Sequence, residues 1–239
     1  VPGEVLESTV LNTPMEEGGA ELRGFETGWG WVRTDFYAVT VCLDADKDPK
    51  EYLTEIMNDP TAMGNGVDTE SWVGWPAAGE GGRKQGDVVD LNIWSLDNGA
   101  IIYLDVDLTD GEFCVMTVEN DVSGTHPISG TRCFGYEEMG GKEVMFYTAS
   151  IESSSVWGTG DVGAALQDGM WKALMKSIAS DVVKDGGKVC KLFVDDEWHS
   201  QTDLLKKLRK QGYTIKSNSL DDTVEVDEKY DLEITIGIR

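Results

Sequence analysis

The sequence lacks any apolar run near the roughly 20 residues that a helix needs to cross a bilayer. It has two histidines and four cysteines, and no two cysteines stand in a Cys-x-x-Cys spacing. This pattern indicates neither a zinc site nor a redox pair, and it leaves disulfides open. Gly-x-Ser-x-Gly, Walker and His-Glu-x-x-His motifs are missing as well. We therefore expect no catalytic residue, no metal and no cofactor.

Basic residues are scarce, because 20 Lys and Arg stand against 44 Asp and Glu, which gives a net charge of −24. The imbalance lies in residues 1–170, which hold 31 acidic and 8 basic residues, whereas residues 171–239 hold 13 and 12. Nucleic acid and anionic membrane surfaces repel such a protein, so neither is an expected partner. We interpret the acidity as a solubilising surface, with a basic partner or an acidic compartment as alternatives.

The chain starts at Val1, with neither a methionine nor an apolar leader. We therefore expect a processed or truncated N-terminus. A hydrophobic fraction of 40% and eight tryptophans are typical of a folded, soluble protein. These features do not distinguish one cellular compartment from another.

A long amphipathic helix is predicted over residues 162–184. Its apolar residues recur at every fourth position and so share one side of the helix. They are Leu166, Met170, Leu174, Ile178 and Val182. Asp161 is the expected N-cap, and Gly186 and Gly187 are expected to end the helix. Such a helix must pack its apolar side on another element.

Strands joined by tight turns are predicted before this helix. Apolar and polar residues alternate along them, which favours an antiparallel sheet with one wet face. The first hairpin of the meander is expected to turn at residues 97–99, Asp-Asn-Gly. The expected strands are residues 35–43, 71–75, 88–96, 100–108, 112–122, 131–136 and 142–152.

A short helix is predicted after the first strand, with Asp48 as N-cap, Pro49 at the first helical position and Glu51 in the capping box. Asp48 also belongs to an Asp-x-Asp-x-Asp run that starts at Asp44 and matches the spacing of a calcium loop. Pro49 stands where that loop needs glycine, so we prefer the helix cap. Residues 158–163 match Gly-x-Gly-x-x-Gly, but they follow an antiparallel meander and do not open a βαβ unit, so no dinucleotide site is expected.

The order of these elements, the segment RKQGDVVDLNIWSLDNGAIIYLDV (residues 83–106) and the closing helix resemble the helix-grip fold of the START and polyketide-cyclase-like (SRPBCC) superfamily. The resemblance spans about residues 35–187. It implies an α+β fold in which a curved, seven-stranded antiparallel sheet wraps around a long C-terminal helix.

Two segments lie outside this resemblance. Residues 1–34 are expected to form an extended N-terminal arm, and residues 188–239 a small α/β appendage that docks on the main domain. The appendage is predicted to contain strands over residues 189–194, 213–217 and 230–238 and a helix over residues 200–210.

The resemblance also implies a hydrophobic cavity between helix and sheet. The expected function is non-catalytic binding or carriage of an apolar or amphipathic small molecule (a lipid, sterol, polyketide or pigment), with the short helices near residues 49–65 as a lid. Aromatic and apolar residues, with two arginines as polar anchors, suit such a pocket. The candidate ligand-binding residues are Trp72, Trp75, Arg83, Trp94, Tyr103, Arg132, Leu166, Met170, Trp171 and Leu174. For any single one of them, ordinary core packing is the simpler interpretation.

Two other functions remain open. A cyclase or hydrolase on the same scaffold would need a pocket acid or base with a shifted pKa. A non-catalytic acidic subunit of a larger assembly would have a filled cavity and would bind its protein partner through the N-terminal arm or the C-terminal appendage. Because no catalytic motif is present, we favour the binding function.

Overall fold

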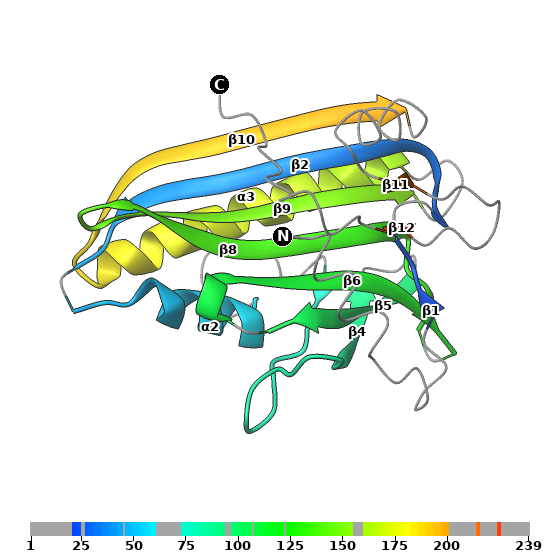
Figure 1. The fold of residues 1–239 in the computed structure, drawn as a ribbon, viewed down its shortest axis with the longest axis horizontal. Coiled ribbons are helices and arrows are strands. Elements are labelled where there is room, and N and C mark those ends of the chain that lie inside the picture. Colours follow the sequence, from blue (N-terminus) through cyan, green and yellow to red (C-terminus); the bar gives the residue numbers. More distant parts are fainter. Residues whose placement is uncertain are drawn as a thin grey trace.

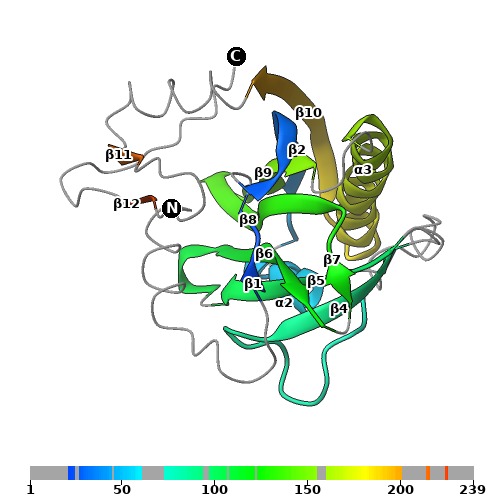
Figure 2. The same ribbon diagram turned by 90° about the vertical axis from the view of Figure 1, so that its right-hand side faces the viewer.

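The computed structural model describes residues 21–24, 27–44, 46–60, 73–93, 97–106, 108–121, 123–154, 160–200, 214–215 and 224–225. Figures 1 and 2 show a large curved sheet, with the long helix α3 (Gly160–Lys184) and the shorter α2 (Pro49–Asn58) on the inner side of its curve. Within the described residues, neither helix combines the length and the hydropathy that crossing a bilayer requires.

Ten strands form this sheet within the described residues. They are β1 (Glu21–Leu22), β2 (Trp29–Cys42), β3 (Val73–Gly74), β4 (Val88–Ile93), β5 (Asp97–Asp105), β6 (Glu112–Asn120), β7 (Gly124–Thr125), β8 (Ile128–Gly140), β9 (Glu143–Ser154) and β10 (Lys188–Ser200). Their order is β10-β2-β9-β8-β6-β5-β4-β3, while β1 and β7 pair with β6. A 3-10 helix, η4 (Leu108–Asp110), stands between β5 and β6. A separate two-stranded sheet contains β11 (Thr214–Ile215) and β12 (Val224–Glu225).

The neighbouring strands pair antiparallel throughout. The seven strands from β2 to β3 in the sheet order, followed along the chain by α3, confirm the predicted helix-grip α+β fold.

Beyond this fold, β10 pairs with β2 at the edge of the sheet, so the first strand predicted in the tail is present and extends to Ser200. The strand predicted over residues 213–217 corresponds to the shorter β11. The predicted tail helix lies almost wholly, and the last predicted strand wholly, outside the described residues. The division of the chain into an arm, a domain and an appendage stays a prediction.

Helix α3 lays its predicted apolar side on the sheet, with Leu174, Ile178 and Val182 buried. It begins at Gly160, so Asp161 lies in the first turn, and the predicted N-cap is wrong. Its C-terminal end is confirmed, because Gly187 donates its N–H to the carbonyl of Val182 at 2.9 Å. Gly186 has a φ of 90°, which glycine adopts at little cost.

Helix α2 begins as predicted. Asp48 has an extended backbone, and its carboxylate accepts a hydrogen bond from the N–H of Lys50 at 2.9 Å. Pro49 occupies the first helical position, where a missing N–H has no cost. The cap therefore accounts for Asp48 without a bound cation.

The turn between β4 and β5 differs from the prediction. The register pairs Ile93 with Asp97 and Leu91 with Gly99, so residues 97–99 belong to β5 and do not form the turn. A Cβ atom on Gly99 would lie 2.3 Å from Cδ2 of His126. The glycine is thus needed for close packing against His126 and does not form the turn that its sequence context indicates.

Both faces of β5 and β6 are buried, which corrects the expected wet face. On the inner face, Ile101, Tyr103 and Val115 join the main core. The outer face carries a second apolar cluster, formed by Ala100, Ile102, Leu104, Cys114, Met116, Val118 and Cys133. Cys114 and Cys133 are directly opposed on β6 and β8 and form a disulfide.

Burial makes His126 sensitive to pH. Its pKa is lowered to about 4 because burial disfavours the charged imidazolium. The unfolded chain takes up this proton near the ordinary pKa of 6.5, so the folded state loses stability as pH falls from 6.5 to 4. We expect this group to contribute a loss of about 3 kcal/mol over that window.

The His126→Asn variant should lack this loss of stability between pH 6.5 and 4. Its amide oxygen can still accept a hydrogen bond from the N–H of Ile128. The measurement is urea unfolding of both proteins at pH 7 and pH 4.5, with the change between the two pH values compared and not the absolute stabilities. An equal change in both proteins would contradict the assignment.

Candidate functional site

The inner face of the sheet carries charged residues at one end of β2, β9 and β8. The register places Arg33 of β2 opposite Glu152 of β9. The next inward-facing row runs across three strands, from Asp35 through Ser150 to Arg132. Alternate residues of a strand share a face, so both rows point toward α3.

Four of these side chains form a buried network that we call the ion quartet: Arg33, Asp35, Arg132 and Glu152. Nη2 of Arg132 lies 2.8 Å from Oδ2 of Asp35 and 3.6 Å from Oε2 of Glu152. Nη1 of Arg33 lies 3.3 Å from Oδ2 of Asp35 and 3.2 Å from Oε1 of Glu152. Each charge faces opposite charges, as burial requires.

Hydroxyl groups complete the network. Arg132 donates to Oγ of Ser150 at 2.8 Å and to Oγ1 of Thr148 at 3.3 Å, and Arg33 donates to the hydroxyl of Tyr37 at 2.8 Å. Burial raises the pKa of Glu152, and the nearby charge of Asp35 adds to this effect while the two arginines oppose it. The quartet thus includes a carboxyl group that holds its proton more tightly than an exposed one.

Helix α3 covers the quartet with two side chains. The guanidinium of Arg132 lies over the ring of Trp171, with Cζ 4.2 Å from the ring centroid. The amide of Gln167 lies beside Arg132 and Glu152, and with its nitrogen turned toward Glu152 it donates to both carboxylate oxygens at 2.8 and 2.9 Å.

Two polar atoms beside Arg132 are buried and have no hydrogen-bond partner within the described residues. One is Oδ1 of Asp35, an acceptor on a residue that is 3% exposed. The other is Nε1 of Trp171, a donor on a residue that is 5% exposed. Unpaired buried polar atoms are uncommon and costly, so this donor and acceptor are suited to a polar group of a ligand.

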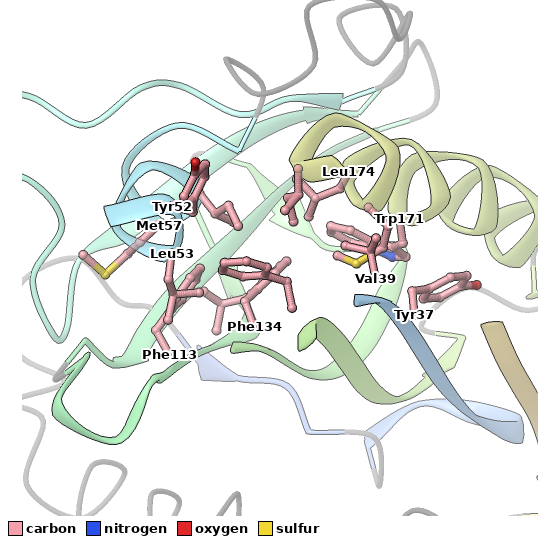
Figure 3. Packing of buried hydrophobic residues seen from close by; sticks show 14 of the residues in the cluster. Tyr37, Val39, Tyr52, Leu53, Met57, Phe113, Phe134, Trp171 and Leu174 are labelled. Atoms are coloured by element: carbon pink, nitrogen blue, oxygen red, sulfur yellow. The ribbon is translucent and has the colours of Figure 1, made fainter. Parts of the chain in front are cut away.

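Toward the other end of α3, aromatic side chains occupy the inner face (Figure 3). Phe134 stacks on Phe113 with ring centroids 4.8 Å apart, and Phe113 stacks on Tyr103 at 6.0 Å. Trp171 and Trp75 both meet Phe134 edge-on, at 5.5 and 6.4 Å. These rings belong to one buried apolar core, which also includes Leu174 and Ile178 of α3.

The predicted ligand-binding residues fall into separate places. Trp75, Tyr103, Trp171 and Leu174 are buried in the main core, and Met170 packs against it. Arg132 belongs to the ion quartet.

Arg83 lies elsewhere, with Cζ 5.5 Å from the ring centroid of Tyr103 and its guanidinium donating to the carbonyl of Pro76. Trp72 and Trp94 are outside the described residues, and of Leu166 only the helical backbone is described.

The sequence interpretation missed Arg33, Asp35 and Glu152. The available signal was the i, i+2 spacing of Arg33 and Asp35 in an apolar strand, followed by Tyr37 and Val39 on the same face. A charged pair in phase with core positions indicates buried ions.

Helix α2 is joined to both its neighbours by tyrosine hydroxyls. Tyr52 donates to Oδ2 of Asp185, just after α3, at 2.7 Å. Tyr103 of β5 donates to the carbonyl of Met57 at 2.8 Å, and burial raises the pKa of Tyr103 to about 12. Any outward movement of α2 must break these two hydrogen bonds.

No protein-family model and no curated protein matches the sequence. Among solved structures, the chain is similar to a START superfamily protein from Mycobacterium smegmatis, at 14% identity and a TM-score of 0.43, over 64% of this chain and 98% of that chain. It is also similar to norcoclaurine synthase from Thalictrum flavum in complex with dopamine and hydroxybenzaldehyde (12%, TM-score 0.42, 63% and 88%). A third such structure is an Hsp90 activator from Plasmodium falciparum (12%, TM-score 0.41, 66% and 99%).

These likenesses concern the fold alone. The strand order and the closing helix, which do not depend on them, give the chain the helix-grip α+β fold that its sequence predicts.

The ion quartet generates a stability prediction. Arg132→Met removes one of two buried cations and leaves Asp35 and Glu152 with Arg33 alone, which should cost about 3–5 kcal/mol of unfolding free energy. The matched control is Arg23→Met, which breaks a part-exposed pair with Glu119 and should cost less than about 1 kcal/mol.

Urea unfolding at neutral pH measures both losses. Adding Asp35→Asn to Arg132→Met should restore part of the stability, because it removes one of the carboxylates left in excess. Equal, small losses in the two single variants would contradict a buried network.

Proposed function

We propose that this helix-grip protein binds a small amphipathic molecule between α3 and the inner face of the sheet, with the polar end of the molecule at the ion quartet. The observation that carries the proposal is the donor and acceptor beside Arg132, Nε1 of Trp171 and Oδ1 of Asp35, which have no hydrogen-bond partner among the described residues. Both atoms are buried under α3, where a ligand of this fold would lie.

The chemistry of these atoms suggests the polar group. A hydroxyl group can both donate and accept, so it suits either Oδ1 of Asp35 or Nε1 of Trp171, whereas a protonated amine can only donate and suits Oδ1 of Asp35 alone. A carboxylate has no proton to donate and would lie beside the charge of Asp35. We therefore expect binding of an alcohol in preference to the corresponding acid.

The apolar part of the ligand would gain its affinity from burial, at roughly 25 cal/mol per Å² of apolar surface. Because Leu174, Ile178 and Val182 of α3 are buried in the core while Met170 is only partly buried against it, the proposal puts this part near Met170. Helix α2 would act as the lid, released when Tyr52 and Tyr103 give up their hydrogen bonds. Trp72, Trp94 and Leu166 remain candidate lining residues.

A second candidate function is catalysis on the same scaffold. It is favoured by Glu152, because burial raises the pKa of this carboxyl group, which is the direction that a general acid requires. In that case the bound molecule would be converted, and Glu152→Gln would abolish the conversion while leaving binding in place.

The test uses native mass spectrometry of the full chain with dodecan-1-ol, dodecylamine and dodecanoate as probes. We expect dodecan-1-ol to bind, and Trp171→Phe to weaken its binding about threefold to tenfold, because one hydrogen bond is lost. Met170→Trp should block binding by filling the site. The matched control is Val183→Trp, which adds the same side chain at an exposed position of the same helix and should leave binding unchanged.

Three results would overturn the proposal or change its class. Binding that is unaffected by Met170→Trp and Trp171→Phe would remove the site from beneath α3. A change in the mass of the bound probe would show that the protein converts it, and the protein would then be an enzyme. A copurifying protein partner, together with no bound probe, would favour the non-catalytic subunit.

A further inference from the structure

Cys42 and Cys190 lie side by side at the edge of the sheet. Cys42 is the last residue of β2, and Cys190 lies in β10, with the two Sγ atoms 3.3 Å apart. The pairing of β10 with β2 is interrupted by a bulge between Val189 and Lys191, so Cys190 is the extra residue of the bulge. The fold thus brings together two thiols that are 148 residues apart in sequence.

Solvent can reach this pair, because Cys190 is exposed and Cys42 is half-buried. The other two cysteines, Cys114 and Cys133, are already bonded and are 1% and 5% exposed. A redox reagent in solution therefore meets Cys42 and Cys190 first.

The pair stands at a junction of several elements. Cys42 leads from β2 toward α2, and Cys190 follows the turn between α3 and β10. At the same corner, Asp185 pairs with Lys47 at 2.9 Å and accepts from Tyr52. The pair with Lys47 is exposed and contributes little, so a covalent bond at this corner would add more than this ion pair does.

We propose that Cys42 and Cys190 form a reversible disulfide by exchange with a low-molecular-weight disulfide such as oxidised glutathione. The bond would anchor β10 to β2. Within the described residues β10 pairs along one side only, with β2, and unsupported edge strands open more readily than central ones. Oxidation would thus decide whether the start of β10 is held covalently at this edge of the sheet.

The exchange proceeds in two balanced steps. One cysteine thiolate attacks a sulfur of oxidised glutathione, which forms a mixed disulfide and releases one glutathione thiolate. The second cysteine thiolate then attacks the protein sulfur of the mixed disulfide, which forms the Cys42–Cys190 bond and releases the second glutathione. Two protein thiols are oxidised, and one glutathione disulfide is reduced to two thiols.

The experiment equilibrates the purified full chain in glutathione buffers of different redox ratio and then alkylates free thiols without unfolding. In reducing buffer we expect alkylation at Cys42 and Cys190. In oxidising buffer we expect no alkylation, a mass lower by two hydrogen atoms than that of the reduced, unalkylated chain, and a linked peptide that contains both residues. The oxidised protein should melt about 5 °C or more above the reduced protein, because the bond closes a long loop.

The matched controls are Cys42→Ser and Cys190→Ser, which should show no redox-dependent melting and should keep a glutathione adduct on the remaining thiol. Hydrogen exchange of β10 gives an independent readout, with slower exchange expected in the oxidised wild-type protein. The proposal is overturned if both thiols are still alkylated after equilibration in oxidising buffer, or if each cysteine ends with its own glutathione adduct.

Discussion

The ion pair between Arg132 and Asp35 is the contact on which the charged half of the structure depends. Arg132 joins β8 to β2 through Asp35 and to β9 through Ser150. Its guanidinium also makes a cation–π contact with the ring of Trp171. One side chain thus connects three strands with the helix above them. Without the positive charge of Arg132, two buried carboxylates would face only Arg33, and α3 would lose its polar support.

The inner face of the sheet therefore has two parts with different physical roles. The aromatic part, from Trp171 to Tyr103, is packed and contributes hydrophobic stabilisation. The charged part costs desolvation, and in the described part of the chain Oδ1 of Asp35 and Nε1 of Trp171 have no hydrogen-bond partner, so this part contributes less to stability. Buried charged groups that reduce stability are typical of functional sites. For this reason we place the proposed ligand at the ion quartet.

Local sequence signals were sufficient for most of the fold. The four-residue period of Leu174, Ile178 and Val182 identified α3, and Asp48-Pro49 identified the start of α2. These predictions succeed because helix periodicity and caps depend on residues within a few positions of each other. The prediction of a turn at residues 97–99 was wrong. Gly99 is required there because it packs closely against His126, which is distant in sequence.

The sequence by itself indicated most of the elements between residues 35 and 187 and their order, its resemblance gave the helix-grip class, and it included Arg132 and Trp171 among the site residues. Only the tertiary structure decided that Arg132 meets Asp35, that Cys42 meets Cys190 and that the outer face of β5 and β6 is buried. Each of these facts depends on strand register and on the curvature of the sheet, which bring together residues that are many positions apart. No local periodicity or spacing encodes such contacts, because they arise only when the whole sheet closes around its helix.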